Sequence, residues 1–143
     1  MAKTNPEVIL LLGYPINKEG KASEEIFPGH LVEFGGIHTL QKQSTAGQNC
    51  RRAFAIENDL VGKGIEDSYA ISEQLQYIST GPGTEIYARV AAGAPAILTG
   101  DQLEAAGDGT LQKLTTGDVI GYAIEDKDNS VGTEEVFLKM EVA

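Results

Sequence analysis

The single cysteine and the two histidines of this sequence are side chains that take part in nucleophilic and metal chemistry: Cys50, His30 and His38. A catalytic thiol requires a neighbouring base, yet both histidines stand in glycine-rich strand-and-turn context. The histidines are eight residues apart and no third ligand lies near them, so the spacing does not match a zinc site. We therefore expect Cys50 to be a small apolar residue, the histidines to lie at strand ends, and no metal or cofactor to be bound.

Two other segments imitate ligand-binding loops. Gly62-Lys63-Gly64 resembles part of a phosphate nest, but the rest of the phosphate loop and its helix are missing, so a plain turn is expected. Residues 125–130 carry alternating carboxylates, but counting from Asp126 puts Val131 where a calcium loop needs glycine. A solvated turn is the better interpretation. Without a metalloprotease, nucleophile-elbow or phosphate-loop motif, the sequence predicts a protein that is not an enzyme.

Charge and composition narrow the class further. The 143 residues contain 21 acids and 11 bases, a formal charge of −10, and such a surface repels nucleic acid. The 17 glycines and the few aromatic residues indicate short strands joined by many turns in one mainly β domain. The apolar run from Val8 to Leu12 is too short for a signal peptide or a membrane helix. A single cysteine fits synthesis in a reducing cytoplasm.

An internal repeat is the most informative feature of the sequence. Gly29–Lys42 aligns with Gly100–Lys113 without a gap, and both segments end in Thr-Leu-Gln-Lys. After a three-residue adjustment, Phe54–Glu57 aligns with Tyr122–Glu125. Two units are too few for a solenoid, so we expect two similar halves that close on each other as a small β-barrel. The alignment predicts that the isoleucines in the second pair of segments face inward.

The matching extends to a third strand in each half, because Glu85–Val90 resembles Glu135–Met140 in its acidic, apolar and basic positions. We therefore expect a single β domain at 26–143, made of halves at about 26–92 and 97–143. Two segments lack a partner, residues 1–25 and roughly residues 59–78. Such additions are free to make intermolecular contacts.

The first unmatched segment is interpreted as an extended N-terminal arm over residues 1–25. Its apolar run would fasten the subunit to a neighbour or to another protein by strand addition. The alternative is that the run is the first strand of the subunit's own barrel. The candidate arm residues are Glu7, Val8, Ile9, Leu10, Leu11 and Leu12, and the candidate inter-subunit loop contains Leu60, Gly62, Lys63, Gly64 and Ile65.

Several segments together resemble the capsid decoration, or cement, proteins of tailed bacteriophages, and the likeness covers nearly the whole chain. The segments that carry it are Glu7–Gly13, Pro28–Glu33, Ala53–Ala70, Gly83–Ala88, Gly100–Leu103 and Gly109–Lys113. One departure is Ser72-Glu73, where such proteins would carry a Gly-Asp turn.

The resemblance implies a β-tulip subunit that forms a homotrimer on the outer surface of an icosahedral head. There it would bind the major capsid protein and stabilise the shell, as a structural virion protein made in the host bacterial cytoplasm. Three linked contacts would slow release, because partial detachment is followed by rebinding at high effective concentration. The expected partners are the capsid protein and other copies of this chain, with no nucleic acid and no membrane.

A ligand-binding or carbohydrate-binding β module for host attachment is the alternative function. Its stacking platform would have to come from the five tyrosines, although scattered tyrosines in a β fold more often fill the core or its rim. These are Tyr14, Tyr69, Tyr77, Tyr87 and Tyr122.

Overall fold

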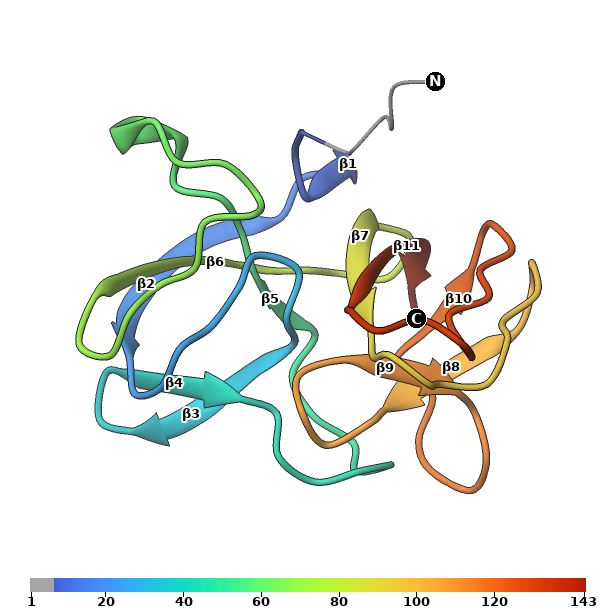
Figure 1. Ribbon diagram of the computed structural model, residues 1–143. Coiled ribbons are helices and arrows are strands. Elements are labelled where there is room, and N and C mark those ends of the chain that lie inside the picture. Colours follow the sequence, from blue (N-terminus) through green and yellow to red (C-terminus); the bar gives the residue numbers. More distant parts are fainter. Residues whose placement is uncertain (1–6) are drawn as a thin grey trace.

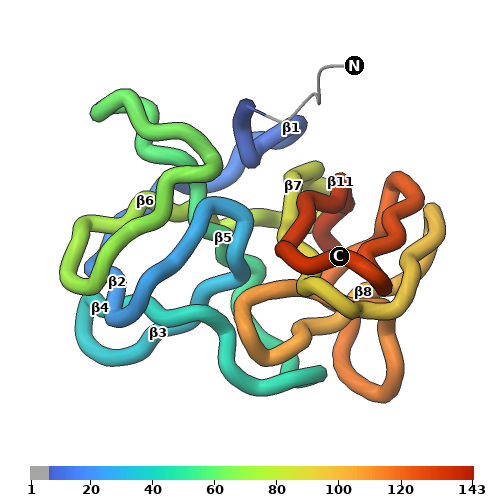
Figure 2. The backbone as a smooth tube through the Cα atoms, viewed as in Figure 1, coloured from blue at the N-terminus to red at the C-terminus, as the bar shows by residue number. Residues whose placement is uncertain are grey.

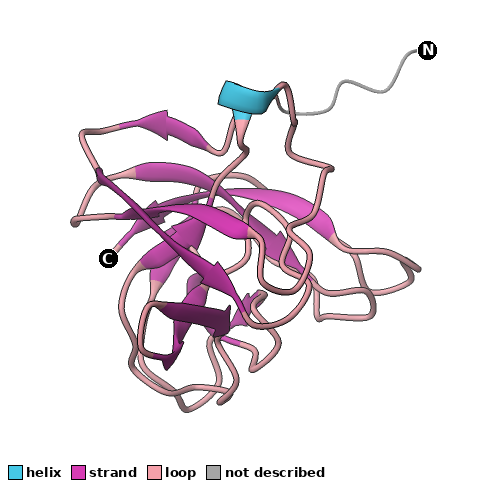
Figure 3. Cartoon of the chain, turned by 90° about the vertical axis from the view of Figure 1, so that its left-hand side faces the viewer, coloured by secondary structure: helices cyan, strands magenta, loops and turns pink. Residues whose placement is uncertain are grey.

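A computed structural model describes residues 7–143, which form short strands joined by turns, with one 3-10 turn (Figure 1). The elements are β1 (Leu10–Leu12), β2 (Ile16–Ala22), β3 (Val32–Gly36), β4 (Thr39–Lys42), β5 (Ala53–Ala55), η1 (Asp59–Val61), β6 (Gln74–Ser79), β7 (Glu85–Val90), β8 (Gln102–Ala105), β9 (Leu111–Lys113), β10 (Gly121–Ala123) and β11 (Val136–Val142). Figure 3 shows the scarcity of helix. The expectation of a mainly β domain is confirmed. Within residues 7–143, no helix has the length and apolar character needed to cross a membrane.

The strands form two sheets that lie side by side (Figures 1 and 2). One sheet has the order β3-β4-β2-β6-β5, and the other has the order β1-β7-β11-β10-β8-β9. Every strand pair is antiparallel except β2 with β4. The first sheet uses β2 to β6 and the second uses β7 to β11, with β1 added at one edge.

The two sheets repeat one five-stranded plan. In each unit the first strand pairs with the fifth, the fifth with the fourth, and the second with the third. The strand registers agree as well, since the bridge between Leu31 and Phe54 corresponds to the pair Gln102 and Tyr122. These are the residues that the sequence alignment of the two halves places at equivalent positions. The bridge between Ile26 and Tyr69 likewise corresponds to the bridge between Ile97 and Lys127. The duplicated core predicted from the sequence is therefore present in the fold.

The second unit does not close into a barrel. In the first unit the backbone N–H of Lys21 donates to His38 O, which joins β2 to β4. The equivalent acceptor in the second unit is Gly109 O, and it accepts instead from Leu31 N in the first unit. The β8–β9 hairpin is thus held by the neighbouring unit, and β7 and β9 do not pair with each other. The expectation of a closed barrel is wrong for this reason.

The predicted N-terminal arm is also corrected. Residues 16–22 form β2, which lies between β4 and β6 in the first sheet, and Ile9 is fully buried in the core. Residues 1–6 lie outside the described part of the chain. The alternative interpretation, in which the apolar run belongs to its own subunit, describes β1 correctly, because β1 pairs with β7.

The halves of the repeat begin at different places from those expected. Glu85–Val90 does not correspond to Glu135–Met140, because these segments are the neighbouring strands β7 and β11. The counterpart of β7 is β2, since Lys18 opposes Tyr77 as Ile86 opposes Met140. The repeat therefore includes β2, and residues 16–25 belong to the domain.

The core continues from one unit into the other. The larger cluster of buried side chains combines Leu31, Phe54 and Ile78 of the first unit with the interior of the second. A smaller cluster fills the first unit. Ile56 and Ile124 occupy equivalent positions, since their N–H groups donate to Gln76 O and Lys139 O, but both are only half-buried. They follow the ends of β5 and β10, and Ile56 packs against the larger cluster from its rim, so the two positions match as expected but neither side chain is fully buried.

Candidate functional site

The apolar run near the N-terminus divides between core and surface. Ile9 is buried and Leu10 packs against the core, because Ile9 O accepts from Tyr87 N at 2.9 Å and ties the segment to β7. Val8 and Leu12 keep 47% and 61% of their surface exposed. Glu7 and Leu11 are exposed as well. Four of the six candidate arm residues are therefore available for contact with another protein.

Two exposed apolar residues lie beside this run within the predicted arm but were not among its six candidate residues. Tyr14 is fully exposed and Ile16 is 64% exposed, on the connection from β1 to β2 and at the start of β2. Both follow turn residues, Gly13 and Pro15, and an apolar residue just after such a break was the available signal.

The candidate inter-subunit loop divides in the same way. Leu60 and Val61 lie in η1 and are 87% and 65% exposed, and Gly62 ends the turn with a φ of 77°. Lys63 makes an ion pair with Glu73 at 3.2 Å. Gly64 N donates to Asp67, and Ile65 is buried in the core. Of the five candidate loop residues, Leu60, Gly62 and Gly64 are exposed, whereas Ile65 is not available for intermolecular contact.

Elements β1 and η1 lie at the same end of the molecule (Figures 1 and 3). A hydrogen bond of 3.2 Å from Ile9 N to Glu57 Oε2 connects the two segments. Monomeric proteins seldom expose large apolar patches without a partner. We call the exposed side chains at this end the apical apolar surface: Val8, Leu11, Leu12, Tyr14, Leu60 and Val61.

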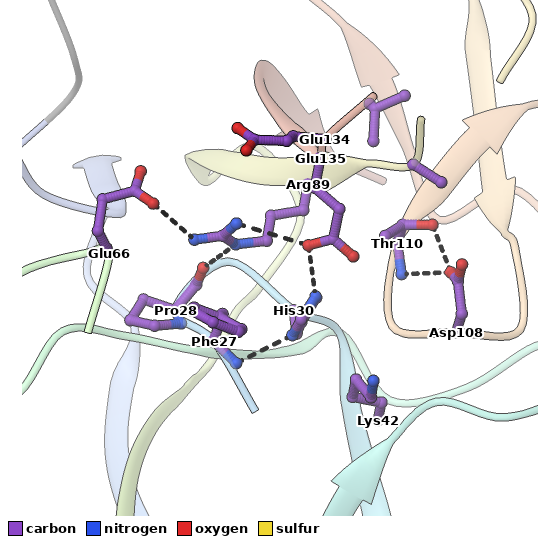
Figure 4. A network of polar contacts seen from close by, with 12 residues as sticks. Phe27, Pro28, His30, Lys42, Glu66, Arg89, Asp108, Thr110, Glu134 and Glu135 are labelled. Atoms are coloured by element: carbon purple, nitrogen blue, oxygen red, sulfur yellow. Dashed lines mark hydrogen bonds and ion pairs between the residues drawn. The ribbon is translucent and has the colours of Figure 1, made fainter. Parts of the chain in front are cut away.

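A buried ionic cluster joins the two units at their junction (Figure 4). Arg89 on β7 is 5% exposed, and its Nε and Nη2 donate to Pro28 O at 2.6 Å and Ile65 O at 3.0 Å. Its Nη1 lies 3.5 Å from Glu135 Oε1. The guanidinium also stacks on Phe137, whose ring centroid is 4.4 Å away. Burial lowers the pKa of Arg89, and the nearby carboxylates of Glu135 and Glu66 oppose that change.

His30 completes this cluster from the first unit. Its Nδ1 accepts from Phe27 N at 3.0 Å, which assigns the ring proton to Nε2, and Nε2 then donates to Glu135 Oε1 at 2.9 Å. Burial opposes ionisation of Glu135, but the His30 hydrogen bond and the charge of Arg89 outweigh it and lower the pKa of that carboxyl. The cluster is a structural connection between two repeats, and no local motif in the sequence announces it.

The other residues considered for catalysis or metal binding make contacts that stabilise the local structure. Cys50 is half-buried, and burial raises the pKa of its thiol, which disfavours the reactive thiolate. Asp126 accepts from the backbone and hydroxyl of Thr99, and Asp128 accepts from Ser130 in the same way. Within residues 7–143, no three histidine, cysteine or acidic side chains cluster as metal ligands would.

The five tyrosines do not form one stacking platform. Tyr69 is buried with its hydroxyl donating to Ile56 O at 2.7 Å, and Tyr77 is 4% exposed. Tyr87 packs edge-on against an aromatic ring. Only Tyr14 and Tyr122 keep substantial exposure. Tyr14 lies on the connection from β1 to β2, whereas Tyr122 lies in β10. This arrangement removes the main structural support for the carbohydrate-binding alternative.

Comparison with known proteins gives a match in structure but not in sequence. No protein family model matches this chain, and no curated protein matches it. A similar solved structure is that of the N base of head fiber gp8.5 in bacteriophage phi29, with a TM-score of 0.56 and 15% identity. The match covers 91% of this chain and 95% of that one. Over nearly its whole length, this protein therefore has the fold of a phage head-fiber base.

Proposed function

We propose that this protein is a structural component of a tailed-phage head that decorates the outer capsid surface and stabilises the shell. The observation that carries the proposal is the fold match, because it extends over nearly all of a protein described as the base of a head fiber. The resemblance of several sequence segments to capsid decoration proteins points to the same class of function. The expected partners are the major capsid protein and two further copies of this chain.

The apical apolar surface supplies a physical reason for binding a protein partner. Leu12, Tyr14 and Leu60 each expose more than half of their surface at one end of the subunit. Burying such side chains against another protein would contribute about 25 cal/mol for each Å² of apolar area removed from water. A trimer would present this surface three times, so that modest single contacts add up to slow release.

Charge agrees with an exterior position. A protein of net charge −10 is repelled by packaged nucleic acid, and so the outer face of the shell is the expected location. Synthesis in the host bacterial cytoplasm is compatible with the single half-buried thiol.

The proposal is tested by two measurements on the purified protein. Light scattering behind size exclusion reports the mass, and we expect three times the 15.2 kDa of one chain. Cosedimentation with heads assembled without the protein then reports binding. A protein that stays monomeric and does not sediment with heads would contradict the proposal.

A matched pair of variants locates the contact. Leu12→Asp lies in the apical apolar surface, whereas Val131→Asp changes a residue that is 93% exposed on another loop. We expect the Leu12 variant to lose most of its binding to heads and the Val131 variant to keep it, with both proteins melting as the wild type does. Equal binding by the two variants would place the capsid contact elsewhere.

A further inference from the structure

Strand β2 has one edge that is only partly paired. It pairs with β6 from Ile16 to Lys21, but on its other side it pairs with β4 only at Lys21 and Ala22. Within residues 7–143, no strand pairs with that side between residues 16 and 20. An unpaired edge of this kind is a template for strand addition.

The backbone groups at this edge can be assigned from the alternation of the strand. Ala22 N donates to Glu73 O on the β6 side, whereas Lys21 N donates to His38 O on the β4 side. Alternation directs the N–H and C=O of Glu19 and Asn17 to the same side as those of Lys21. These two residues therefore present the hydrogen-bonding groups of the open edge.

The equivalent edge in the second unit is occupied. The counterpart of Glu19 is Tyr87, and its N–H donates to Ile9 O at 2.9 Å. Strand β1 continues the pairing, with Leu10 opposite Ile86. In the second unit, therefore, a short extended apolar segment of the same chain occupies the edge of β7 that corresponds to the open edge of β2.

A groove runs along the open edge of β2. Two adjoining concavities of about 340 and 470 Å³ share Glu19, Gly20 and His38 in their walls. Phe34 and Ile37, beside the groove, are 58% and 90% exposed.

The second unit shows no such opening at the equivalent positions. The residues that correspond to Lys18, Phe34 and Tyr77 are Ile86, Ala105 and Met140, and all three are fully buried. The polar and aromatic lining is therefore a property of the first unit alone.

Charge at the groove favours a segment that carries a carboxylate. Lys18 lines it, and the Arg51 guanidinium stacks on Phe34 at 4.2 Å from the ring centroid. Nη1 of Arg51 is buried and has no hydrogen-bond partner among the described residues. The Glu19 side chain alternates with that of Lys18 and lies on the opposite face of β2, where its carboxylate accepts from Gln76 Nε2 at 3.0 Å.

We propose that an extended segment of the capsid partner, apolar and bearing a carboxylate, adds to the open edge of β2 as a further strand. The segment pairs with the backbone of Asn17 and Glu19, and its side chains enter the groove. Ile37 and His38, in the turn between β3 and β4, form one wall of the groove. This inference rests on the proposed function and names a second contact site for the same partner, in addition to the apical apolar surface.

Substitution of Glu19 tests the pairing directly. Glu19→Pro removes an N–H that the fold itself does not use, and proline is tolerated at strand edges. Glu19→Ala is the matched control, since it removes the same side chain and keeps the N–H. We expect Glu19→Pro to bind heads about tenfold more weakly or worse, and Glu19→Ala to bind within about twofold of the wild type, at similar melting temperatures.

Hydrogen exchange on the wild-type protein covers the case in which the proline variant misfolds. Addition of a strand protects the amides of Asn17 and Glu19 when heads are added. Binding of wild type with unprotected amides, or full binding by a folded Glu19→Pro variant, overturns this inference and leaves the proposed function standing. Failure of the wild type to bind heads overturns both. Protection by an oligosaccharide instead of heads would assign the groove to a different ligand and also overturn the inference.

Discussion

His30 and Glu135 lie 105 residues apart in sequence, yet His30 Nε2 donates to Glu135 Oε1 across 2.9 Å at the junction of the two units. Arg89 contacts the same carboxylate oxygen. Since His30 comes from the first unit and the other two residues from the second, this cluster holds the repeats together through charge-assisted hydrogen bonds.

Removal of the buried cation should therefore destabilise the whole protein. Arg89→Met leaves Glu135 with one fewer partner and leaves the carbonyls of Pro28 and Ile65 without their donors. We expect a loss of about 3 kcal/mol in the free energy of unfolding, the range for breaking a buried ion pair. Lys21→Met changes the equivalent, exposed residue of the first unit and should be nearly neutral. Urea denaturation of both variants measures the difference, and equal stabilities would refute this account of the cluster.

Acid should weaken the same junction. The folded protein lowers the pKa of Glu135, so the ionised form contributes stability that is fully present above the unfolded value, about 4.3. That contribution is lost as pH falls through the lower, folded pKa. Melting curves recorded from about pH 6 to about pH 3 should therefore fall less steeply for Glu135→Gln than for the wild type. Glu57→Gln gives the opposite sign, because burial raises the pKa of Glu57.

Substitution of Gly121 on β10 by any larger residue is expected to destabilise the fold. A Cβ at this position would lie 2.1 Å from Met140 Cε and 2.5 Å from Glu141 O, so backbone as well as side chain would have to move. Gly121→Ala should cost about 1–3 kcal/mol, as overpacking does. At Gly64 the nearest atom to a new Cβ is 4.0 Å away, and Gly64→Ala should be tolerated. Thermal unfolding of the two variants distinguishes them, and an unaffected Gly121→Ala protein would contradict the close packing of β10 against β11.

Replacement of Ser72 by glycine should increase the stability of the protein. Its φ is 71°, a region that is unfavourable for residues with a Cβ, and its N–H donates to Ala22 O at 2.7 Å. Ser72→Gly keeps this hydrogen bond and removes the strain, so we expect a gain of about 0.5–1 kcal/mol. Ser68→Gly, nearby and without a positive φ, should instead be neutral or destabilising. The melting temperatures of both variants decide the point.

Deletion of residues 2–25 should abolish folding. The deletion removes β2, which pairs with β4 and β6, and it removes the buried side chain of Ile9. Circular dichroism of the truncated chain should lack the cooperative transition of the wild type. Leu12→Ser, in the same segment but on the surface, should leave that transition unchanged. A truncated protein that melts cooperatively near the wild-type temperature would restore the idea of a separable arm.

The sequence by itself determined the fold class and the existence of the repeat. The Thr-Leu-Gln-Lys strands, and the glycines before them, recur because β alternation and turn conformation depend on residues close together in the chain. The glutamates at positions 33 and 104 accept from Gln41 and Gln112, so local chemistry reappears at equivalent places. The apolar run from Val8 to Leu12 was also visible as a segment that needed a partner.

Only the tertiary structure decided which strand completed each unit and what joined the units. Strands β2 and β7 are equivalent, yet their side chains differ. Lys18 and Lys21 of β2 occupy the positions of Ile86 and Arg89 in β7. Such differences hide the match, because side chains follow the surroundings of each strand while the backbone pairing is the same. The junction of His30, Glu135 and Arg89 was equally invisible, since it brings together residues from both units, and burial and charge at such a place are set by packing between distant segments.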